Sequence, residues 1–305
     1  MNMLVLLNRA AGSATDDAPE RIVAAFARHG VTADVRAVDA DALGATARAA
    51  TNEPFDAIVG CGGDGTLNTV AAALAGTSMP FGVLPLGTYN HFARELGIPL
   101  EIDEAAAALA TAAPSDIDVA EVNGRLFLNF TGIGFHPTMV QRREEEQQSG
   151  RRKFVAMLLA IVRVLGRLPI LRVGLASQGA RPEWRITPSV IVCTNAFQMK
   201  AFGVERLSYP DRGVLNVYLA ATTRWYDLVV LFVRGLLGAL ASAKNFEARV
   251  LPDLTIHLHR RQVEISIDGE LTELRTPLVF KIRRGGLRVL VPAPAAETAP
   301  LPPAS

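Results

Sequence analysis

The sequence predicts an α/β protein with a doubly wound, mostly parallel α/β domain first and an antiparallel β-sandwich domain second. Its 305 residues are half apolar and one fifth charged, enough to bury a core in each of two domains. Short apolar runs alternate with alanine-rich helical segments up to about residue 120, and β-branched runs follow. We place the domains at residues 1–120 and 121–291, allow the last strand to return to the first domain, and expect a disordered tail at 292–305.

The first domain has the pattern of repeated βαβ units. Its apolar runs are too short for helices and are joined by helical crossovers, which predicts a parallel sheet covered on both faces. Ligands of such sheets bind at the carboxyl ends of the strands. The expected strands are Leu4–Leu7, Asp34–Val38, Ala57–Val59 and Phe81–Leu84, and the expected helices are Glu20–His29, Ala42–Ala50 and Leu67–Ala75.

The second domain opens with the clearest hairpin signal in the chain, Asn123-Gly124. Two helices, Lys153–Leu168 and Trp225–Leu240, interrupt strands rich in β-branched residues. The other expected strands are Val119–Val122, Leu126–Phe130, Leu171–Ala176, Val190–Thr194, Val214–Leu219, Leu254–Leu258, Val263–Ile267, Leu278–Ile282 and Leu287–Val291.

Charge and cysteine content exclude several classes of protein. The 31 basic and 30 acidic residues leave a net charge of +1, too low for a dedicated nucleic-acid binder. The two cysteines have no CxxC spacing, which argues against a zinc site or a disulfide framework. The first residues do not form a signal peptide, and the longest apolar stretches fall short of a membrane span of about 20 residues. We expect a cytoplasmic protein, with peripheral association at the inner face of the cell membrane as an option.

A glycine-dense loop, Gly60-Cys61-Gly62-Gly63-Asp64-Gly65-Thr66, joins an expected strand to an expected helix. Glycines let backbone N–H groups approach phosphate oxygens, and the helix start supplies unpaired donors. An ordinary tight turn needs only one or two glycines, so phosphate binding is the favoured interpretation. The loop is not on the first strand of its unit and lacks the later acidic residue of a dinucleotide site, and no Walker A lysine is present.

The next strand leads into a second polar loop, Pro85-Leu86-Gly87-Thr88-Tyr89-Asn90-His91-Phe92-Ala93-Arg94. Thr88 and Asn90 could hydrogen-bond phosphate or sugar, although Asn90 could equally be a helix N-cap. Arg94 could neutralise phosphate charge or form a surface ion pair. Because the two strands are adjacent in the predicted sheet, both loops are expected at one edge.

At these loops the sequence resembles the diacylglycerol kinase catalytic-domain family, which includes bacterial lipid kinases and the sphingosine and ceramide kinases. The matching motifs are Gly62-Gly63-Asp64-Gly65-Thr66-Leu67-Asn68, Pro85-Leu86-Gly87-Thr88-x-Asn90 and Asp268-Gly269-Glu270. The resemblance implies a fold like that of diacylglycerol kinase and NAD kinase. It also implies an ATP-dependent lipid kinase that phosphorylates the hydroxyl of a membrane lipid such as diacylglycerol, ceramide or a sphingoid base.

The resemblance also implies roles for individual residues. Glu270 would be the catalytic base, since a lipid hydroxyl is a weak nucleophile that must lose its proton. Asp64 would organise Mg²⁺, a cation that prefers carboxylate oxygen. Without the resemblance, Glu270 would be interpreted as a turn residue and Asp64 as a helix cap. The nucleotide site would comprise Asn8, Gly62, Gly63, Asp64, Gly65, Thr66, Asn68, Gly87, Thr88, Asn90, Arg94 and Asp268.

Two positions depart from the family pattern. His91 stands where many members have aspartate, so metal coordination can differ, or the imidazole can contact phosphate or simply pack. In the segment Tyr209–Leu215, an arginine stands where the family has a metal-binding aspartate, and Asp211 lies one residue earlier. We therefore predict no second metal in this segment.

Membrane contact is suggested by a basic cluster, Arg151-Arg152-Lys153, leading into an apolar helix, although an ordinary helix with a solvated end fits as well. The expected partner is a lipid substrate at the membrane surface, with no nucleic acid, and a homodimer is left open. Two alternatives remain: a soluble kinase of the NAD kinase type, and a non-catalytic nucleotide-binding regulator. The sequence does not choose between diacylglycerol, ceramide, sphingoid bases and phosphatidylglycerol.

Overall fold

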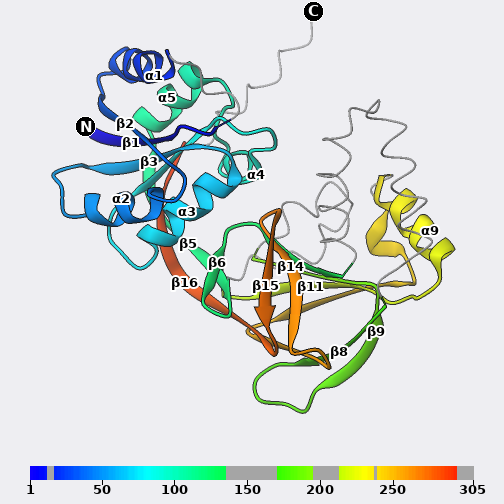
Figure 1. Ribbon diagram of the computed structural model, residues 1–305. Helices are drawn as coiled ribbons and strands as arrows, with labels where there is room; N and C mark the ends of the chain where they lie inside the picture. The colour runs from blue at the N-terminus through cyan, green and yellow to red at the C-terminus, as the bar shows by residue number, and fades with distance from the viewer. Residues whose placement is uncertain (12–16, 135–169, 195–212, 237–238, 294–305) are drawn as a thin grey trace, which may run out of the picture. The chain divides into compact units, whose positions relative to one another are not determined.

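The computed structural model describes residues 1–11, 17–134, 170–194, 213–236 and 239–293 (Figure 1). The chain divides into two compact units, which are described separately. Unit 1 comprises Met1–Ser115 and the chain from Arg288 onward, and unit 2 is Asp116–Leu287. The helix expected at Lys153–Leu168, the segment around Asp211 and the tail after residue 293 lie outside the described residues.

Unit 1 is a parallel sheet covered by helices, as the sequence predicts. Its strand order is β2-β1-β3-β4, and every neighbouring pair is parallel. The end of β16 joins beside β4, where Val289 lies opposite Phe81. The strands are β1 Asn2–Asn8, β2 Thr32–Val38, β3 Ala57–Gly62, β4 Phe81–Pro85 and β16 Leu278–Val291.

Burial in unit 1 explains its sequence pattern. All six residues of β3 and all five of β4 are buried, because helices cover both faces of the sheet. In Figure 1, α1 and α5 lie together on one side of the strands, and α2 and α3 lie on the other. The helices are α1 Ala18–Ala27, α2 Leu43–Ala50, α3 Asp64–Leu74, α4 His91–Glu95 and α5 Ile102–Ala110.

Unit 2 is built from two antiparallel sheets, which confirms the antiparallel architecture predicted for the later part of the chain. One sheet, here called the second sheet, has the order β12-β11-β10-β7-β14-β15. The other contains β16, β13, β8 and β9, and the β5–β6 hairpin pairs with β16. The bounds are β5 Ala113–Val122, β6 Arg125–Phe127, β7 Phe130–Gly134, β8 Leu171–Ala176, β9 Glu183–Thr187, β10 Ser189–Cys193, β11 Leu215–Ala220, β12 Phe246–Leu251, β13 Leu254–Leu258, β14 Gln262–Ile267 and β15 Glu270–Arg275.

The core of unit 2 lies between these sheets. Ile133 and Val217 of the second sheet belong to the same buried cluster as Ile256 and Phe280 of the other. Alternate residues along each strand enter this cluster, so the remaining positions of the second sheet form an outer face. The helix α9 Trp225–Leu236 and the short 3₁₀ helix η2 Leu240–Ser242 follow β11.

The predicted Asn123-Gly124 hairpin is present. Asn123 and Gly124 both have positive φ angles, 49° and 81°, as a tight β-hairpin turn requires. The Asn123 amide also donates to the carbonyl oxygen of Arg275 at 2.8 Å and accepts from the Val279 N–H at 2.7 Å. The turn residue therefore joins β5–β6 to the turn before β16.

Several elements differ from the sequence prediction, and three of these differences are described here. Helix α3 begins at Asp64 rather than Leu67, because Gly63 is extended and an acidic side chain in the first turn suits the helix dipole. Helix α9 is described as far as Leu236 and Ala239 is no longer helical, so the helix ends before the predicted Leu240. The two strands expected at 278–282 and 287–291 form one strand, β16, in which Gly285 adopts a φ of 55°.

Within the part of the chain that the structure describes, no helix is both long and apolar enough to cross a lipid bilayer.

Candidate functional site

The two glycine loops of unit 1 lie directly against each other. The Leu86 N–H donates to the Gly62 carbonyl oxygen at 2.9 Å, which continues the β3–β4 pairing into the loops. A Cβ atom on Gly87 would stand only 2.5 Å from the Cα atom of Gly63. Gly87 must therefore be glycine for the loops to approach this closely, whereas a Cβ atom on Gly63 would make only ordinary contact, 3.4 Å from the Cα atom of Gly87.

Asp64 connects the two loops. It is the first residue of α3, and its carboxylate accepts a hydrogen bond from the Phe92 N–H at 3.3 Å. No side-chain hydrogen bond caps α3, so the structural role of Asp64 is to join α3 to α4. Its carboxylate is only partly buried.

The donor set around Asp64 fits a magnesium ion of the kind bound with phosphate. Among the described residues, no group of three or more His, Cys, Asp or Glu side chains could hold a metal. Mg²⁺ usually keeps several waters and binds through one or two carboxylates together with substrate phosphates. A single carboxylate beside a phosphate loop is therefore adequate, and Asp64 is the residue that would hold the ion.

Asn8 reaches the same loop from the end of β1. Its amide donates to the Thr66 hydroxyl at 2.8 Å, and its carbonyl oxygen accepts from the Ala10 N–H at 3.0 Å. Thr66 is buried, and a Cβ atom on Gly62 would lie 2.6 Å from its hydroxyl oxygen. The structure therefore brings together Asn8, Gly62 and Thr66, three of the residues that the resemblance assigns to the nucleotide site.

The second loop is held by Asn90, which adopts a left-handed backbone with φ of 51°. Its side chain accepts from the Gly87 N–H at 2.9 Å and donates to the Gly87 carbonyl oxygen at 2.8 Å. Thr88 and Arg94 are exposed, and the Arg94 guanidinium donates to the Tyr89 carbonyl oxygen at 3.1 Å. Asn90 thus shapes the loop, while Thr88 and Arg94 are accessible to a ligand.

Four further residues of unit 1 have simpler surroundings. His91 stacks on Tyr89 with the ring centroids 5.6 Å apart, which favours a packing role over a metal-binding one. Gly65 and Asn68 lie in the first turns of α3 and are partly buried. Burial raises the pKa of the Cys61 thiol, so this residue is a neutral core side chain and not a thiolate nucleophile.

In unit 2, Asp268 and Glu270 lie on the turn between β14 and β15 and have opposite surroundings. The Asp268 carboxylate accepts hydrogen bonds from three backbone N–H groups: Leu128 at 2.8 Å, Asn129 at 2.8 Å and Phe130 at 2.9 Å. Asp268 thereby fixes the segment that enters β7. The Glu270 side chain is exposed and makes no hydrogen bond or ion pair with the described residues, so its carboxylate is accessible.

Sequence reasoning missed a set of buried polar groups in unit 2. Four of its side-chain atoms have no hydrogen-bond partner among the described residues, and each residue is at most 4% exposed. Leaving such a group unpaired costs about 1–3 kcal/mol, so stability alone does not account for them. In the sequence, the only sign of such a buried polar group is a polar residue within an otherwise apolar strand. The four atoms are Asn129 Oδ1, Asn216 Oδ1, Tyr218 OH and Ser266 Oγ.

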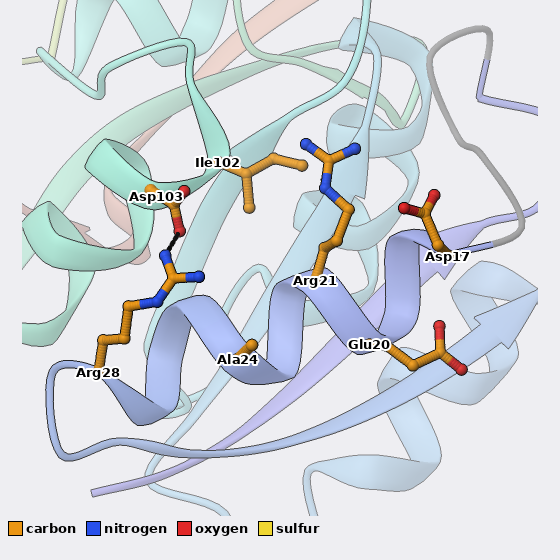
Figure 2. Close-up of a pocket in the computed structure, with 7 residues that line it drawn as sticks. All are labelled: Asp17, Glu20, Arg21, Ala24, Arg28, Ile102 and Asp103. Atoms are coloured by element: carbon orange, nitrogen blue, oxygen red, sulfur yellow. Dashed lines mark hydrogen bonds and ion pairs between the residues drawn. The ribbon is translucent and has the colours of Figure 1, made fainter.

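A surface hollow of about 350 Å³ lies between α1 and α5 (Figure 2). Its charged side chains have both signs, and Arg28 pairs with Asp103 across it. None of the predicted site residues lines the hollow, so it is separate from the glycine loops. The lining residues are Asp17, Glu20, Arg21, Ala24, Arg28, Ile102 and Asp103.

Comparison with known proteins places this arrangement in a family. Residues 2–122 match the family model for the diacylglycerol kinase catalytic domain. A Pseudomonas aeruginosa protein named "Probable lipid kinase YegS-like" is 33% identical over 258 residues, covering 78% of each chain.

Solved structures show the same fold. The crystal structure of a diacylglycerol kinase from Bacillus anthracis superposes with a TM-score of 0.67 at 19% identity, covering 96% of this chain and 97% of that one. An Archaeoglobus fulgidus NAD kinase, solved in complex with ATP, gives 0.50 at 14% identity, covering 95% and 93%. The glycine loops, the two-unit fold and the identity with these relatives together show that the chain belongs to the diacylglycerol kinase catalytic-domain family of lipid kinases.

Proposed function

We propose that this chain is an ATP-dependent lipid kinase that transfers the γ-phosphoryl group to the hydroxyl of a membrane lipid. The observation that carries the proposal is the close approach of Gly63 and Gly87, which leaves two backbone loops side by side at the carboxyl ends of β3 and β4. Such loops bind phosphate, and the family to which the chain belongs consists of kinases.

The nucleotide phosphates are expected at the start of α3, where backbone N–H groups have no partner within the helix. Asn8, Thr66 and Asn90 hold the loops through the hydrogen bonds described above. Thr88 and Arg94 are exposed and can contact phosphate oxygens. Mg²⁺ would be held by Asp64 and would neutralise phosphate charge when bound.

Glu270 is proposed as the base. Its carboxylate takes the proton of the lipid hydroxyl as that oxygen bonds to the γ-phosphorus and the bond from phosphorus to the ADP oxygen breaks. Asp268 positions the turn by accepting three backbone hydrogen bonds, and it is not a base in this scheme. The free carboxylate of Glu270 supports this division of roles.

Peripheral contact with a membrane is part of the proposal. Helix α9 exposes Tyr226 (45%) and Val230 (50%), which are one helical turn apart. The Arg224 guanidinium lies 5.8 Å from the centre of the Tyr226 ring. Exposed aromatic, apolar and basic side chains on one helix are typical of a helix that lies in a lipid interface.

The test is phosphoryl transfer from γ-labelled ATP, with Mg²⁺, to mixed micelles containing diacylglycerol, ceramide, sphingosine or phosphatidylglycerol. Label in a lipid is the expected result. The same assay includes NAD as a soluble acceptor, and label in NAD alone would favour the soluble NAD kinase type. ATP binding with no label in any acceptor would overturn the kinase proposal and favour a nucleotide-binding regulator.

A further inference from the structure

The sheet of unit 2 that contains β8, β9 and β13 has an outer face with an exposed tryptophan. Strand β8 buries Val173 in the core between the sheets, so its neighbours Arg172 and Gly174 point outward. Strand β9 lies beside β8, with Ile186 opposite Arg172 and Trp184 opposite Gly174. Directly opposed residues share a face, so these outward positions form one surface, here called the Trp184 surface. Its main members are Ile170, Arg172, Trp184, Ile186, His259 and Lys281.

The indole of Trp184 is held in place by its neighbours and is still 40% exposed. Its ring stacks on that of His259, with the centroids 5.1 Å apart and the planes 12° from parallel. The Arg172 guanidinium lies 5.2 Å from the ring centre. A Cβ atom on Gly174 would come within 3.2 Å of the indole, so the ring lies directly over the backbone of β8. Trp184 is therefore a fixed aromatic side chain that remains accessible.

Two isoleucines extend the apolar part of this surface. Ile186 is 58% exposed, and Ile170, directly before β8, is 57% exposed. Leu171 packs against the core, so Ile170 points outward. The described residues include eight exposed large apolar side chains, and Ile170, Ile186 and Trp184 are three of them. Scattered exposed apolar residues need no explanation, but three together on one face indicate an interaction site.

The Trp184 surface is basic. On β8, β9 and β13, which are described in full, no outward position carries an acidic residue, and β13 adds His257. On β16, Val279 lies opposite Thr255, so Lys281, two residues later, also points outward and is exposed. Neither Arg172 nor Lys281 pairs with a carboxylate of the described residues. This local excess of positive charge stands out in a chain whose net charge is only +1.

The acidic residues next to this surface are already paired. Glu183 of β9 points to the opposite side, where the Arg249 guanidinium donates to it. Asp253, directly before β13, accepts hydrogen bonds at 3.0 and 2.8 Å from the turn that follows β8. Arg283, further along β16, pairs with Glu121. The unpaired charge on the Trp184 surface is therefore positive.

We propose that the Trp184 surface docks the protein on a bilayer that contains anionic phospholipid. Tryptophan is enriched where proteins meet the membrane interface, because its ring is apolar and its N–H is polar. Ile170 and Ile186 lie beside it and would enter the same layer. Arg172 and Lys281 would contact lipid phosphates, since an anionic membrane surface attracts basic side chains.

An anionic membrane fits this surface better than two other partners. A second copy of the chain would bring the same unpaired positive charges together. A nucleic acid would match the charge and the aromatic ring, but it would leave both isoleucines in water. The inference goes beyond the proposed phosphoryl transfer, since docking of this kind needs neither nucleotide nor acceptor lipid.

The Trp184 surface lies at the same edge of unit 2 as helix α9. Among the described strands, β9 and β12 end their sheets, and Arg249 of β12 pairs with Glu183 of β9. The 3₁₀ helix η2 contacts both β12 and α9. The membrane contact proposed for α9 is therefore a neighbour of this surface, and we expect both to contribute to docking.

The test measures docking without nucleotide or Mg²⁺. Full-length protein is co-sedimented with vesicles of phosphatidylcholine, with or without phosphatidylserine, a lipid that has no free hydroxyl to phosphorylate. We expect binding to the anionic vesicles that weakens as salt is added. Trp184→Ser and Lys281→Glu are each expected to weaken this binding about three- to tenfold.

Two variants of unit 1 are the matched controls. Val23→Ser and Arg48→Glu alter an exposed apolar and an exposed basic side chain outside the Trp184 surface, and both should retain wild-type vesicle binding. Thermal unfolding checks that Trp184→Ser is folded. Lys281→Glu tests the surface independently, because its side chain is exposed and has no ion-pair partner among the described residues.

Fluorescence reports directly on Trp184. The chain has two tryptophans, so Trp225→Phe leaves Trp184 as the only one. Its emission is expected to shift to shorter wavelength on anionic vesicles and not on neutral ones, because the indole leaves water. A ring that merely stabilised the fold would show no such shift.

Equal binding to neutral and anionic vesicles, wild-type binding by both Trp184→Ser and Lys281→Glu, or an unchanged Trp184 emission would each overturn the inference. Tighter binding to duplex DNA than to the vesicles would overturn it in favour of a nucleic acid. Loss of self-association in Trp184→Ser without any vesicle binding would overturn it in favour of a second copy. Docking without phosphoryl transfer would uphold the inference and count against the kinase proposal, whereas transfer to micelles by a protein that does not dock would do the reverse.

Discussion

The polar side chains in the glycine loops of unit 1 differ in their hydrogen bonding from those on the outer face of the second sheet in unit 2. In the loops, Asn8 and Asn90 are hydrogen-bonded to the chain itself, which fixes the backbone before any ligand arrives. On the outer face, Asn216 Oδ1, Tyr218 OH and Ser266 Oγ are buried without a partner in the described chain. The first region is preorganised by its own residues, and the second contains buried polar atoms that no described residue satisfies.

The same contrast recurs within one turn of unit 2. Asp268 is saturated by three backbone donors, and Glu270, two residues later, has an accessible carboxylate. A side chain bonded to its own chain contributes mainly to stability, whereas a free one is available for chemistry. Substitutions at these places should therefore separate effects on stability from effects on turnover.

The largest expected effect is on turnover. Glu270→Gln removes the free carboxylate and should lower kcat for lipid phosphorylation by about 100- to 10,000-fold, the usual contribution of a general base. Nucleotide affinity and Tm should change little, because the Glu270 side chain makes no hydrogen bond with the described residues. Steady-state kinetics and thermal unfolding measure the two quantities.

The control for this change is Glu273→Gln, which alters another exposed glutamate on the same strand, β15. It should retain wild-type kcat. If Glu270→Gln kept near-wild-type turnover, Glu270 would not be the base and its accessible position would need another explanation.

The next effect tests the preorganised loops. Gly87→Ala would place a Cβ atom 2.5 Å from Gly63 Cα and 2.8 Å from Asn90 Oδ1, so one loop must move. We expect destabilisation of about 1–3 kcal/mol from overpacking and roughly tenfold weaker ATP binding, or about 1.4 kcal/mol. Chemical denaturation and nucleotide titration report the two effects.

Gly44→Ala is the matched control for Gly87→Ala. Its Cβ atom would make only ordinary contact, 3.5 Å from Thr69 Cγ2, and alanine is the better residue inside helix α2. It should leave ATP affinity unchanged and stability equal or higher. Equal losses of ATP affinity in the two variants would show that the Gly63–Gly87 approach does not shape the nucleotide site.

A third substitution tests the structural role of Asp268, which lies on the same turn as Glu270. Asp268→Asn replaces one accepting oxygen with an NH₂ group that faces backbone donors from Leu128, Asn129 and Phe130. Unfolding free energy should fall by about 1–3 kcal/mol, measured by urea denaturation. Glu270→Gln should show no such fall, and a stable Asp268→Asn variant would contradict the proposed difference between the two carboxylates.

Local signals in the sequence predicted much of this organisation. Asn123-Gly124 identified the first hairpin because its turn conformation depends on those two residues alone. The glycine loop was recognised from its spacing. The sequence predicts that both glycine loops lie at one edge of the sheet, but it does not specify how closely Gly63 and Gly87 approach. Nor does it specify that Asp268 bonds to residues 128–130, which are far from it along the chain. A polar residue in an apolar strand, such as Tyr218, gives no sign of which face it occupies.

The smallest expected effect concerns an exposed polar cluster of unit 1. Arg36 hydrogen-bonds Glu53 at 2.7 and 3.0 Å, which lowers the pKa of that carboxyl below its ordinary value of 4.5. A carboxyl with a lowered pKa stabilises the fold above its unfolded pKa, and this contribution is lost as the pH falls through the folded value. Since both side chains are solvated, salt should weaken the effect further.

Arg36→Gln should therefore lower the urea midpoint at about pH 7 and lower it less at about pH 3, because the contribution of the Glu53 carboxylate is lost as the pH falls below its unfolded pKa. Arg9→Gln, which alters an exposed pair with Asp39 at 3.4 Å, is the control and should shift neither midpoint measurably. An equal shift at both pH values would mean that Arg36 acts through packing on Phe55, whose ring centre lies 5.5 Å from the guanidinium, and not through Glu53. In that case, hydrogen-bonded polar side chains would stabilise unit 1 only where they are buried, as Asn90 is. The difference in hydrogen bonding between unit 1 and unit 2 would then matter only for buried polar atoms.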